Sequence, residues 1–335
     1  LQAESSPRTG QAGTGSPPTT TGNCRSGWFC LDRPVGLPSA AAFSPDGRLL
    51  YVVNAASDDL SVVDLEAGIG VGHVKVGSNP RGIVVSADGL TAWVHNALSD
   101  DVSVVDLTTL EETVRITVTD NPLPEDVLAG KVLFHSSARP EMARDGWISC
   151  ASCHLDGGHD GRTWVLADGP RNTTPIRGLG STFPFHWSGD RVDVFDFQTT
   201  VREVQFGTGL SEEENAHLAA FLAHGEVPAS PYPVDAATKR GEQVFSESGC
   251  ATCHAGGAFT DGLTHDVGTG GAVGEQRGPE FDTPTLLGLY DTAPYLHDGR
   301  APTLRSVFAG GDGPHAAPEG AIDDLVSYLR TLPQG

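Results

Sequence analysis

Two five-residue motifs of one form constrain this chain more than any other feature of its sequence. Residues 150–154 read Cys-Ala-Ser-Cys-His, and residues 250–254 read Cys-Ala-Thr-Cys-His. The two thiols of such a motif can bond covalently to the vinyl groups of a haem, and the adjacent imidazole can bind the iron. The sequence therefore predicts two covalent c-type haems, bound by Cys150, Cys153 and His154 and by Cys250, Cys253 and His254.

A Cys-x-x-Cys pair can also form a zinc site, a thioredoxin-like dithiol or a disulfide. A zinc site would need further Cys or His residues at ligand spacing. A redox dithiol is expected within a thioredoxin-like βαβ unit and does not explain the histidine. Because the motif occurs twice with its histidine, we favour haem over these alternatives.

The predicted haems also bear on where the protein is found. Haem attachment of this kind takes place outside the cytoplasm, so we expect a periplasmic or extracellular protein whose signal peptide has been removed. In that oxidising setting the two other cysteines, Cys24 and Cys30, are expected to form a local disulfide. Residues 1–23 are rich in Ser, Thr, Gly and Pro, and we interpret them as a flexible leader because they cannot bury a core.

The charge of the chain limits its partners. The sequence has 43 acidic and 21 basic side chains, which give a formal net charge of -22. No basic stripe is present to neutralise phosphates, so we do not expect nucleic-acid binding. The charge fits a soluble surface or a redox partner with a basic patch, such as a small cationic cytochrome. No run of about 18 apolar residues occurs, so no membrane span is expected.

A second constraint is an internal repeat with a period of 42 residues. Tyr51–Asn54 recurs as Trp93–Asn96, and Ser57–Leu65 recurs almost unchanged as Ser99–Leu107. Alternating β-branched runs separated by Asp-Gly and Asn/Ser turns predict a small antiparallel sheet in each copy. A period near 40 with four short strands is typical of a β-propeller blade. The copies, over about residues 34–118, resemble YVTN-type propeller repeats.

Residues 24–120 hold only two full copies of this repeat. A propeller needs roughly four or more blades to close its ring, and two blades alone would leave sheet edges exposed. We therefore expect the blades to pack on a neighbour, either the haem domains of the same chain or other chains of a redox complex. We interpret this part as a docking or scaffold module.

Two related halves follow a proline-rich hinge. In each half, apolar residues three and four positions apart predict a helix ahead of the haem motif. Gly130–Phe134 of the first half matches Gly241–Phe245 of the second. We predict c-type haem domains over residues 121–232 and 233–335. The fold class expected is multidomain β + α, a partial β-propeller of two blades followed by two tandem, mainly α-helical, cytochrome c-like haem domains.

A resemblance to a known family is carried by five stretches, Gly130–Phe134, Ile148–His154, Arg171–Pro175, Thr283–Leu286 and Thr292–Gly299. Over about residues 124–333 the chain resembles the bacterial di-haem cytochrome c peroxidase and MauG superfamily. Members with propeller repeats fused ahead of the haem domains have the same layout. The resemblance implies that His154 and His254 are the proximal ligands of the two haem irons.

The resemblance also implies residues between the haems. Trp187 falls where the family has a tryptophan that can relay electrons; the alternative is a buried aromatic that fills the domain seam. The family's calcium ion would have Asn172, Thr292 and the carbonyl of Pro294 as ligands. Oxygen ligands of this kind suit a hard cation, and the alternative is that Asn172 is a turn residue.

The chain departs from the family at the sixth ligand of the second haem. The family often has a distal methionine about fourteen residues after its His-Asp-Gly motif, where this chain has Gly311. The single methionine, Met142, is expected to pack in a core. His315 is the first candidate ligand, followed by His297 and His265.

The first haem also departs from the peroxidatic pattern. Gln198 lies one residue from the place of the family's glutamine, and the family's glutamate has no clear match. Heterolytic cleavage of a peroxide needs such a group to move a proton. His159 and His186 could instead ligate the first iron.

These patterns favour a di-haem c-type redox protein that transfers electrons between partners. The alternative is a hydrogen-peroxide-reducing peroxidase or a MauG-like oxidase. A second alternative is a docking or structural haem subunit of a larger redox complex.

Overall fold

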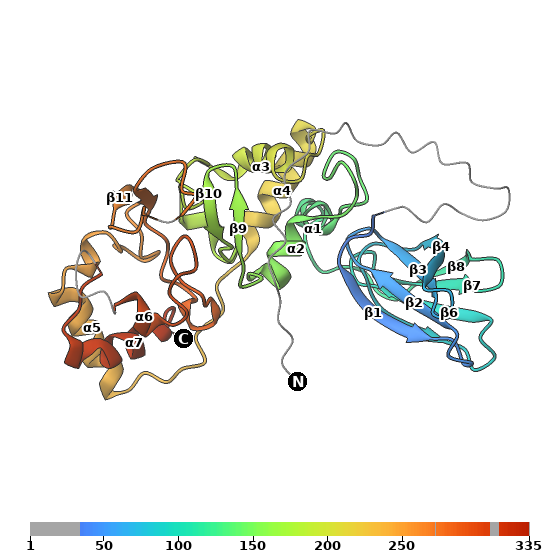
Figure 1. Cartoon of the computed structure of the whole chain (residues 1–335), viewed down its shortest axis with the longest axis horizontal. Coiled ribbons are helices and arrows are strands. Elements are labelled where there is room, and N and C mark those ends of the chain that lie inside the picture. Colours follow the sequence, from blue (N-terminus) through green and yellow to red (C-terminus); the bar gives the residue numbers. More distant parts are fainter. Residues whose placement is uncertain (1–33, 272, 309–314, 335) are drawn as a thin grey trace.

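The computed structural model of the chain describes residues 34–271, 273–308 and 315–334 (Figure 1). Two β-sheets form one end of the molecule, and the two helical halves follow along its long axis. The predicted leader, the Cys24–Cys30 disulfide and Gly311 lie outside the described residues. Within the described ranges, no helix combines the length and the apolar character that crossing a membrane requires.

The 42-residue repeat folds as two four-stranded antiparallel sheets, as the sequence predicts. The strands of each sheet are hydrogen-bonded in chain order. The same turn joins the first two strands of each sheet, because Ser44 Oγ donates to Asp46 Oδ1 and Ser86 Oγ donates to Asp88 Oδ1, both at 2.6 Å. The first sheet contains β1 (Pro38–Phe43), β2 (Leu49–Asn54), β3 (Asp59–Asp64) and β4 (Ile69–Lys75), and the second contains β5 (Pro80–Val85), β6 (Thr91–Asn96), β7 (Asp101–Asp106) and β8 (Glu111–Thr117).

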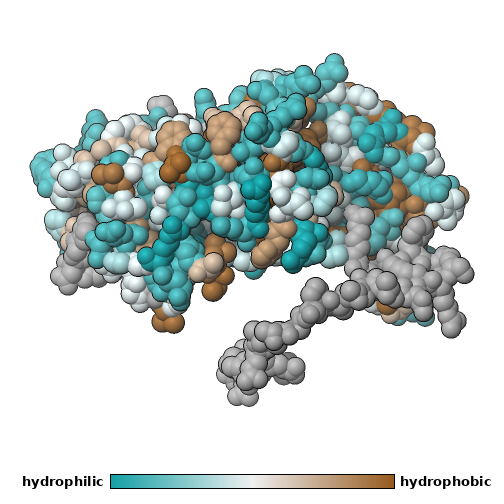
Figure 2. All heavy atoms as spheres, turned by 90° about the horizontal axis from the view of Figure 1, so that it is seen from above, coloured by the Kyte–Doolittle hydropathy of each residue, from teal (hydrophilic) through white to brown (hydrophobic). Residues whose placement is uncertain are grey.

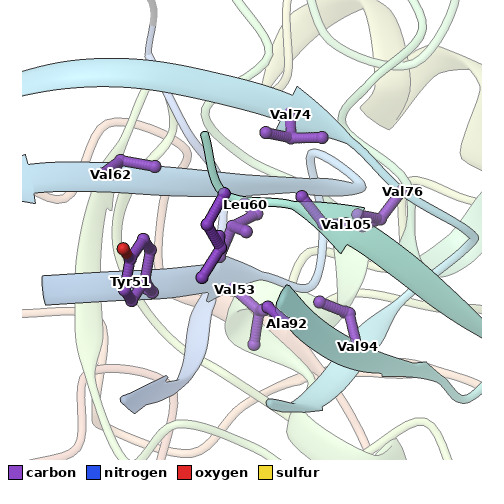
Figure 3. Packing of buried hydrophobic residues seen from close by; sticks show 10 residues of the cluster. Tyr51, Val53, Leu60, Val62, Val74, Val76, Ala92, Val94 and Val105 are labelled. Atoms are coloured by element: carbon purple, nitrogen blue, oxygen red, sulfur yellow. The ribbon is translucent and has the colours of Figure 1, made fainter. Parts of the chain in front are cut away.

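The two sheets pack face to face over one apolar core (Figure 3). Burial of each Val or Leu side chain contributes about 1.5–3 kcal/mol, so this contact holds the sheets together. The most buried members of the core are Tyr51, Val53, Leu60, Val62 and Val74 from the first sheet, Val76 just after it, and Ala92, Val94 and Val105 from the second sheet.

Each helical half is built on a pair of packed helices, α1 (Glu125–His135) with α4 (Glu212–His224) and α5 (Ala236–Glu247) with α7 (Ile322–Arg330). A glycine stands where each pair comes closest. A Cβ atom on Gly130 would lie 1.9 Å from the backbone oxygen of His217, and one on Gly241 would lie 1.9 Å from that of Asp324. Close contact between helix backbones thus accounts for the glycine that the two halves share at the start of their matching stretches. Met142 is fully buried in the core of the first half, where it packs as predicted.

The remaining elements are short and surround these helix pairs. The first half contains α1 (Glu125–His135), α2 (Cys150–Cys153), η1 (Leu155–Gly157), β9 (Thr163–Leu166), β10 (Gly169–Asn172), η2 (Leu179–Ser181), η3 (Val194–Asp196), α3 (Phe197–Glu203) and α4 (Glu212–His224). The second contains α5 (Ala236–Glu247), η4 (Cys250–Thr252), β11 (Thr264–Asp266), β12 (Glu280–Asp282), η5 (Leu289–Asp291), α6 (Leu304–Val307), η6 (Glu319–Ala321) and α7 (Ile322–Arg330).

The first helical half touches the sheets through their strand ends. The backbone N–H of Ser137 donates to the oxygen of Ala56 at 2.7 Å, just beyond β2. Asn121 Nδ2 donates to Asp100 Oδ2 at 2.6 Å, in the turn before β7. These contacts place the helical halves at one end of the sheets.

Candidate functional site

One cavity of about 580 Å³ is lined by residues of both helical halves. Most of its lining side chains are apolar, from α1, α3, α4 and α7 among other elements. It brings together several residues predicted from the sequence, namely both Cys-x-x-Cys-His motifs, His186, Trp187, His265, His297 and His315.

The histidine of the first motif is held in one orientation. Its ring Nδ1–H donates to the backbone oxygen of Thr174 at 2.8 Å. Burial lowers the pKa of His154 to about 4, so its imidazole is neutral at pH 7. With Nδ1 protonated and bonded, Nε2 carries the lone pair that a metal ion needs.

The thiols of the first motif are buried beside this histidine. Burial raises the pKa of Cys150 to about 11, and burial together with Asp160 raises the pKa of Cys153 to about 12. Gln205 Nε2 donates to Cys150 Sγ at 3.2 Å. Both cysteines are therefore neutral thiols at pH 7, and this pocket suits an apolar group better than a bare metal ion.

The second motif repeats this arrangement with a different partner. The ring Nδ1–H of His254 donates to the backbone oxygen of Phe259 at 3.1 Å. Burial lowers the pKa of His254, which keeps the ring neutral, and burial raises the pKa of Cys250. Each half thus presents two thiols and one oriented neutral imidazole to the same cavity.

Trp187 lies at the seam between the two halves. Its indole Nε1–H donates to the backbone oxygen of Asn172 at 2.8 Å, and its own backbone oxygen accepts from the N–H of Asp282 at 2.9 Å. Its ring meets that of His297 edge to face, with centroids 6.4 Å apart. The residue is half-buried and bonds to both halves.

The three predicted calcium ligands lie at the same seam. Asn172 Nδ2 donates to the carbonyl oxygen of Pro294 at 2.6 Å. Asn172 Oδ1 is buried and has no hydrogen-bond partner among the described residues. Thr292 is also buried, two positions from Pro294. Turning the Asn172 amide over would place its oxygen beside the Pro294 carbonyl, an arrangement that suits a cation.

The candidate ligands of the second haem differ in the contacts that their imidazole rings already make. Burial and nearby His254 lower the pKa of His315, which lines the cavity. His265 Nε2 is occupied, because it donates to Asp261 Oδ2 at 2.7 Å. His297 is 1 % exposed and stacks on Phe281 with ring centroids 3.9 Å apart. His315 is thus the candidate with the fewest competing contacts among the described residues.

The two candidates for the first iron lie in different places. His186 lines the cavity, and its Nδ1–H donates to Asp190 Oδ1 at 3.1 Å. His186 Nε2 lies 3.5 Å from Thr200 Oγ1, a weak contact that leaves this nitrogen open. His159 does not line the cavity, and its Nε2–H donates to the backbone oxygen of Asp291 at 3.0 Å. The structure therefore separates His159 from the site.

Gln198, the predicted peroxidatic glutamine, is also outside the cavity. Its Oε1 accepts from the backbone N–H of Leu210 at 2.5 Å and so ties α3 to the segment before α4. The glutamine that does line the cavity is Gln205, which is 3 % exposed and bonds to Cys150. The sequence analysis missed it, because only the path of the chain after α3 brings it back to the motif.

Asp282 is a second cavity residue that the sequence analysis missed. It is 8 % exposed, and its Oδ1 has no hydrogen-bond partner among the described residues. Burial, together with the charge of Asp261, raises the pKa of Asp282 to about 8. The comparison of the two halves carried a signal, because Asp282 precedes the Thr-Pro pair where the first half has Thr173.

An ion pair closes the seam beside the cavity. Arg171 is 6 % exposed and binds Glu275 through two bonds, with Nη1 2.7 Å from Oε2 and Nη2 3.0 Å from Oε1. Its Nε also donates to Asp168 Oδ2 at 3.0 Å. His297 Nε2 lies 3.6 Å from Glu275 Oε2. A bidentate pair of this kind fixes the two halves in register.

One group near the second motif could also hold a metal ion. Cys253, Asp261 and His265 place their ligand atoms within 4.8 Å of one another. This is the zinc alternative, and it competes with haem for Cys253 and for His265, a candidate ligand of the second haem iron.

The chain is similar to several curated proteins. It is 31% identical to the methylamine utilization protein MauG of Methylorubrum extorquens, over 63% of this chain and 79% of that protein. The chain belongs to the MauG/di-haem peroxidase-like family. It is also 28% identical to hydrazine synthase subunit gamma of Kuenenia stuttgartiensis (65% of this chain, 81% of that protein) and 26% identical to cytochrome c peroxidase Ccp of Escherichia coli K12 (63% and 59%).

Two further matches agree with this membership. A solved structure of Kuenenia stuttgartiensis hydrazine synthase superposes with a TM-score of 0.54 at 25% identity, over 64% of this chain and 90% of that chain. The family described as Cytochrome D1 heme domain matches residues 22–137, the part of the MauG-family chain that contains the two sheets.

Proposed function

We propose that this chain is an extracytoplasmic di-haem c-type cytochrome that transfers electrons between partner proteins. The single cavity lined by both Cys-x-x-Cys-His motifs, with Trp187 at the seam between them, carries the proposal. One continuous cavity gives two cofactors a short route through the protein interior.

The residues present fit one haem in each half. Cys150, Cys153 and His154 would hold the first, and Cys250, Cys253 and His254 the second. When bound, a haem supplies an iron that gains and loses single electrons. The chain contributes a largely apolar cavity, neutral thiols and two imidazoles whose Nε2 is left free by the hydrogen bonds of Nδ1.

Sixth ligands complete an electron carrier in this proposal. His315 serves the second haem and His186 the first, because each lines the cavity with a ring nitrogen not taken by a strong hydrogen bond. Two histidine ligands lower the potential of a haem relative to a His/Met pair. Trp187 relays electrons across the seam.

Further parts of the proposal concern the surroundings of the haems. Calcium binds at Asn172, Thr292 and the Pro294 carbonyl. The observation that supports this site is that the buried Asn172 Oδ1 has no hydrogen-bond partner among the described residues. The chain works in the periplasm or outside the cell. Its charge of -22 favours a redox partner with a basic patch. The two sheets are blades of a partial propeller, which the Cytochrome D1 heme domain match supports.

A peroxidase or a MauG-like oxidase is the second candidate. The observation that favours it is Asp282, an acid in the cavity whose pKa of about 8 lets it give and take a proton near neutral pH. Gln205 supplies a further polar group beside the first motif. Similarity to a subunit of hydrazine synthase favours a third role, as a structural haem subunit of a larger complex.

Low-temperature EPR of the oxidised and half-reduced protein, before and after peroxide, separates these functions. An electron carrier gives two low-spin irons that peroxide leaves unchanged. The variant His186→Ala should turn one of them high-spin, whereas His159→Ala, outside the cavity, should not. A wild-type high-spin iron that binds peroxide would reject the carrier and support the enzyme.

A further inference from the structure

The two sheets meet through unlike faces. The first sheet contributes the face that contains Tyr51 and Val62, which are cross-strand partners. The second sheet contributes the face that contains Ala92 and Val105, which are also cross-strand partners. In the 42-residue repeat Tyr51 corresponds to Trp93, which lies on the opposite face of the second sheet. The contact is therefore head to tail.

Among the described residues, nothing covers the face of the second sheet that corresponds, in the repeat, to this buried face. We call it the Trp93 face, and its members are Val84, Trp93, Val102, Val104, Val114 and Ile116. Trp93 is 40 % exposed, whereas its counterpart Tyr51 is 2 % exposed. Val84 is 64 % and Val114 53 % exposed. An apolar face of this extent is a typical interaction surface.

The opposite face of the first sheet is likewise uncovered within the described part of the chain. We call it the Phe43 face, and its members are Ala41, Phe43, Leu50, Val52 and Val63. Their counterparts on the second sheet are Ile83, Val85, Ala92, Val94 and Val105, which pack in the core between the sheets. Phe43 is 62 % exposed, although its counterpart Val85 is packed. Figure 2 shows hydrophobic side chains on the surface at the end of the molecule that the sheets form.

Both faces are accessible beside the helical halves. The first half reaches the sheets at Ala56 and Asp100, which lie in turns beyond the strands. Figure 1 shows the sheets projecting from this attachment. Neither contact uses a residue of the Trp93 face or of the Phe43 face.

We propose that a second copy of this chain packs its Phe43 face on the Trp93 face, repeating the contact that the two sheets already make. The chain itself carries both partners of that contact, so a second copy is the occupant that the structure specifies. Head-to-tail contacts close into a ring when the rotation allows.

Sedimentation velocity of the full chain tests this proposal. The wild type should associate in a concentration-dependent manner. Trp93→Asp and Phe43→Asp should each weaken association about 30-fold or more, because a carboxylate would be buried without a partner. Val165→Asp is the matched control, since Val165 on β9 is 87 % exposed and lies on neither face.

A mixture of the two variants gives the decisive result. The intact Trp93 face of Phe43→Asp can pair with the intact Phe43 face of Trp93→Asp, so equal amounts should form a 1:1 heterodimer and nothing larger. This outcome also shows that both variants fold. If the copies instead met through two Trp93 faces or two Phe43 faces, mixing the two variants would not restore association.

A wild-type chain that stays monomeric up to about 100 µM would overturn the proposal. Association only after deletion of residues 1–33 would assign the face to that segment instead. Neither of these two results affects the proposed haem sites, because sedimentation measures molecular mass and the cavity lies in the helical halves.

Discussion

The indole Nε1–H of Trp187 donates to the backbone oxygen of Asn172, 2.8 Å away. The side chain of the same asparagine donates to the carbonyl of Pro294 in the second half. Asn172 therefore links the aromatic at the seam to both halves of the chain. A change at either residue should affect the communication between them.

Replacing the indole should slow electron transfer between the halves. Trp187→Phe keeps an aromatic ring but loses the bond to Asn172, and should also cost about 1 kcal/mol of stability. Trp187→Leu should slow transfer further. Flash photolysis of half-reduced protein measures the rate. Trp164→Phe is the control, because this half-exposed indole bonds to Asp160 outside the cavity. Equal rates in all variants would exclude a relay at Trp187.

Removal of calcium should destabilise the wild type. A cation present at about 100 times its Kd stabilises the folded state by about 2.7 kcal/mol, so a strong chelator should lower Tm by several degrees. Asn172→Leu should abolish this chelator effect, and Asn121→Leu, which lies at the contact with the sheets and away from the proposed calcium ligands, should retain it. A wild-type Tm indifferent to chelator would contradict the proposed site.

Asp282 should make stability depend on pH. Its pKa of about 8 in the folded state lies above the ordinary aspartate value of 3.8. Between these values the folded state keeps a proton that the unfolded state has released, so stability falls as pH rises from about 4 to 8.

Asp282→Asn removes this pH-dependent contribution to the free energy of unfolding. The variant should therefore be more stable than the wild type by an amount that grows from near zero at pH 4 to about 2 kcal/mol or more at pH 8. Thermal unfolding across this range measures the effect. Asp266→Asn, an exposed change on the same hairpin, should show no such trend. A constant difference between the Asp282 variant and wild type would contradict the buried, protonated carboxyl.

The glycines between packed helices should resist substitution. Gly130→Ala places a methyl group against the backbone oxygen of His217 and should cost about 1–3 kcal/mol. This cost exceeds the gain of about 1 kcal/mol in helix propensity. Denaturant unfolding measures it. Gly225→Ala, where no atom lies within 4 Å of the new methyl, should change stability little.

The sequence predicted the sheets and the helix ahead of each haem motif because local signals specify them. Ser44 and Asp46 recur as Ser86 and Asp88, and both pairs form the same turn. Gly130 and Gly241 occupy equivalent positions for the same steric reason. Such features depend on neighbours in the chain or on internal repetition, and both can be read from one sequence.

The interior of the cavity was harder to predict, because it depends on where long loops return. Gln198 and Gln205 are seven positions apart, yet only Gln205 lines the cavity. His159 follows the first motif closely but turns outward to the backbone of Asp291. Asp282 had a weak signal in the comparison of the halves, and its burial became clear only in three dimensions.

Intact-mass measurement of the denatured chain, produced in a host that attaches c-type haem, tests the central claim most directly. The account predicts a mass greater than that of the polypeptide by two haems. It predicts one haem for Cys150→Ala/Cys153→Ala and one for Cys250→Ala/Cys253→Ala. A wild-type mass equal to that of the bare polypeptide, with all four motif cysteines open to alkylation, would contradict it.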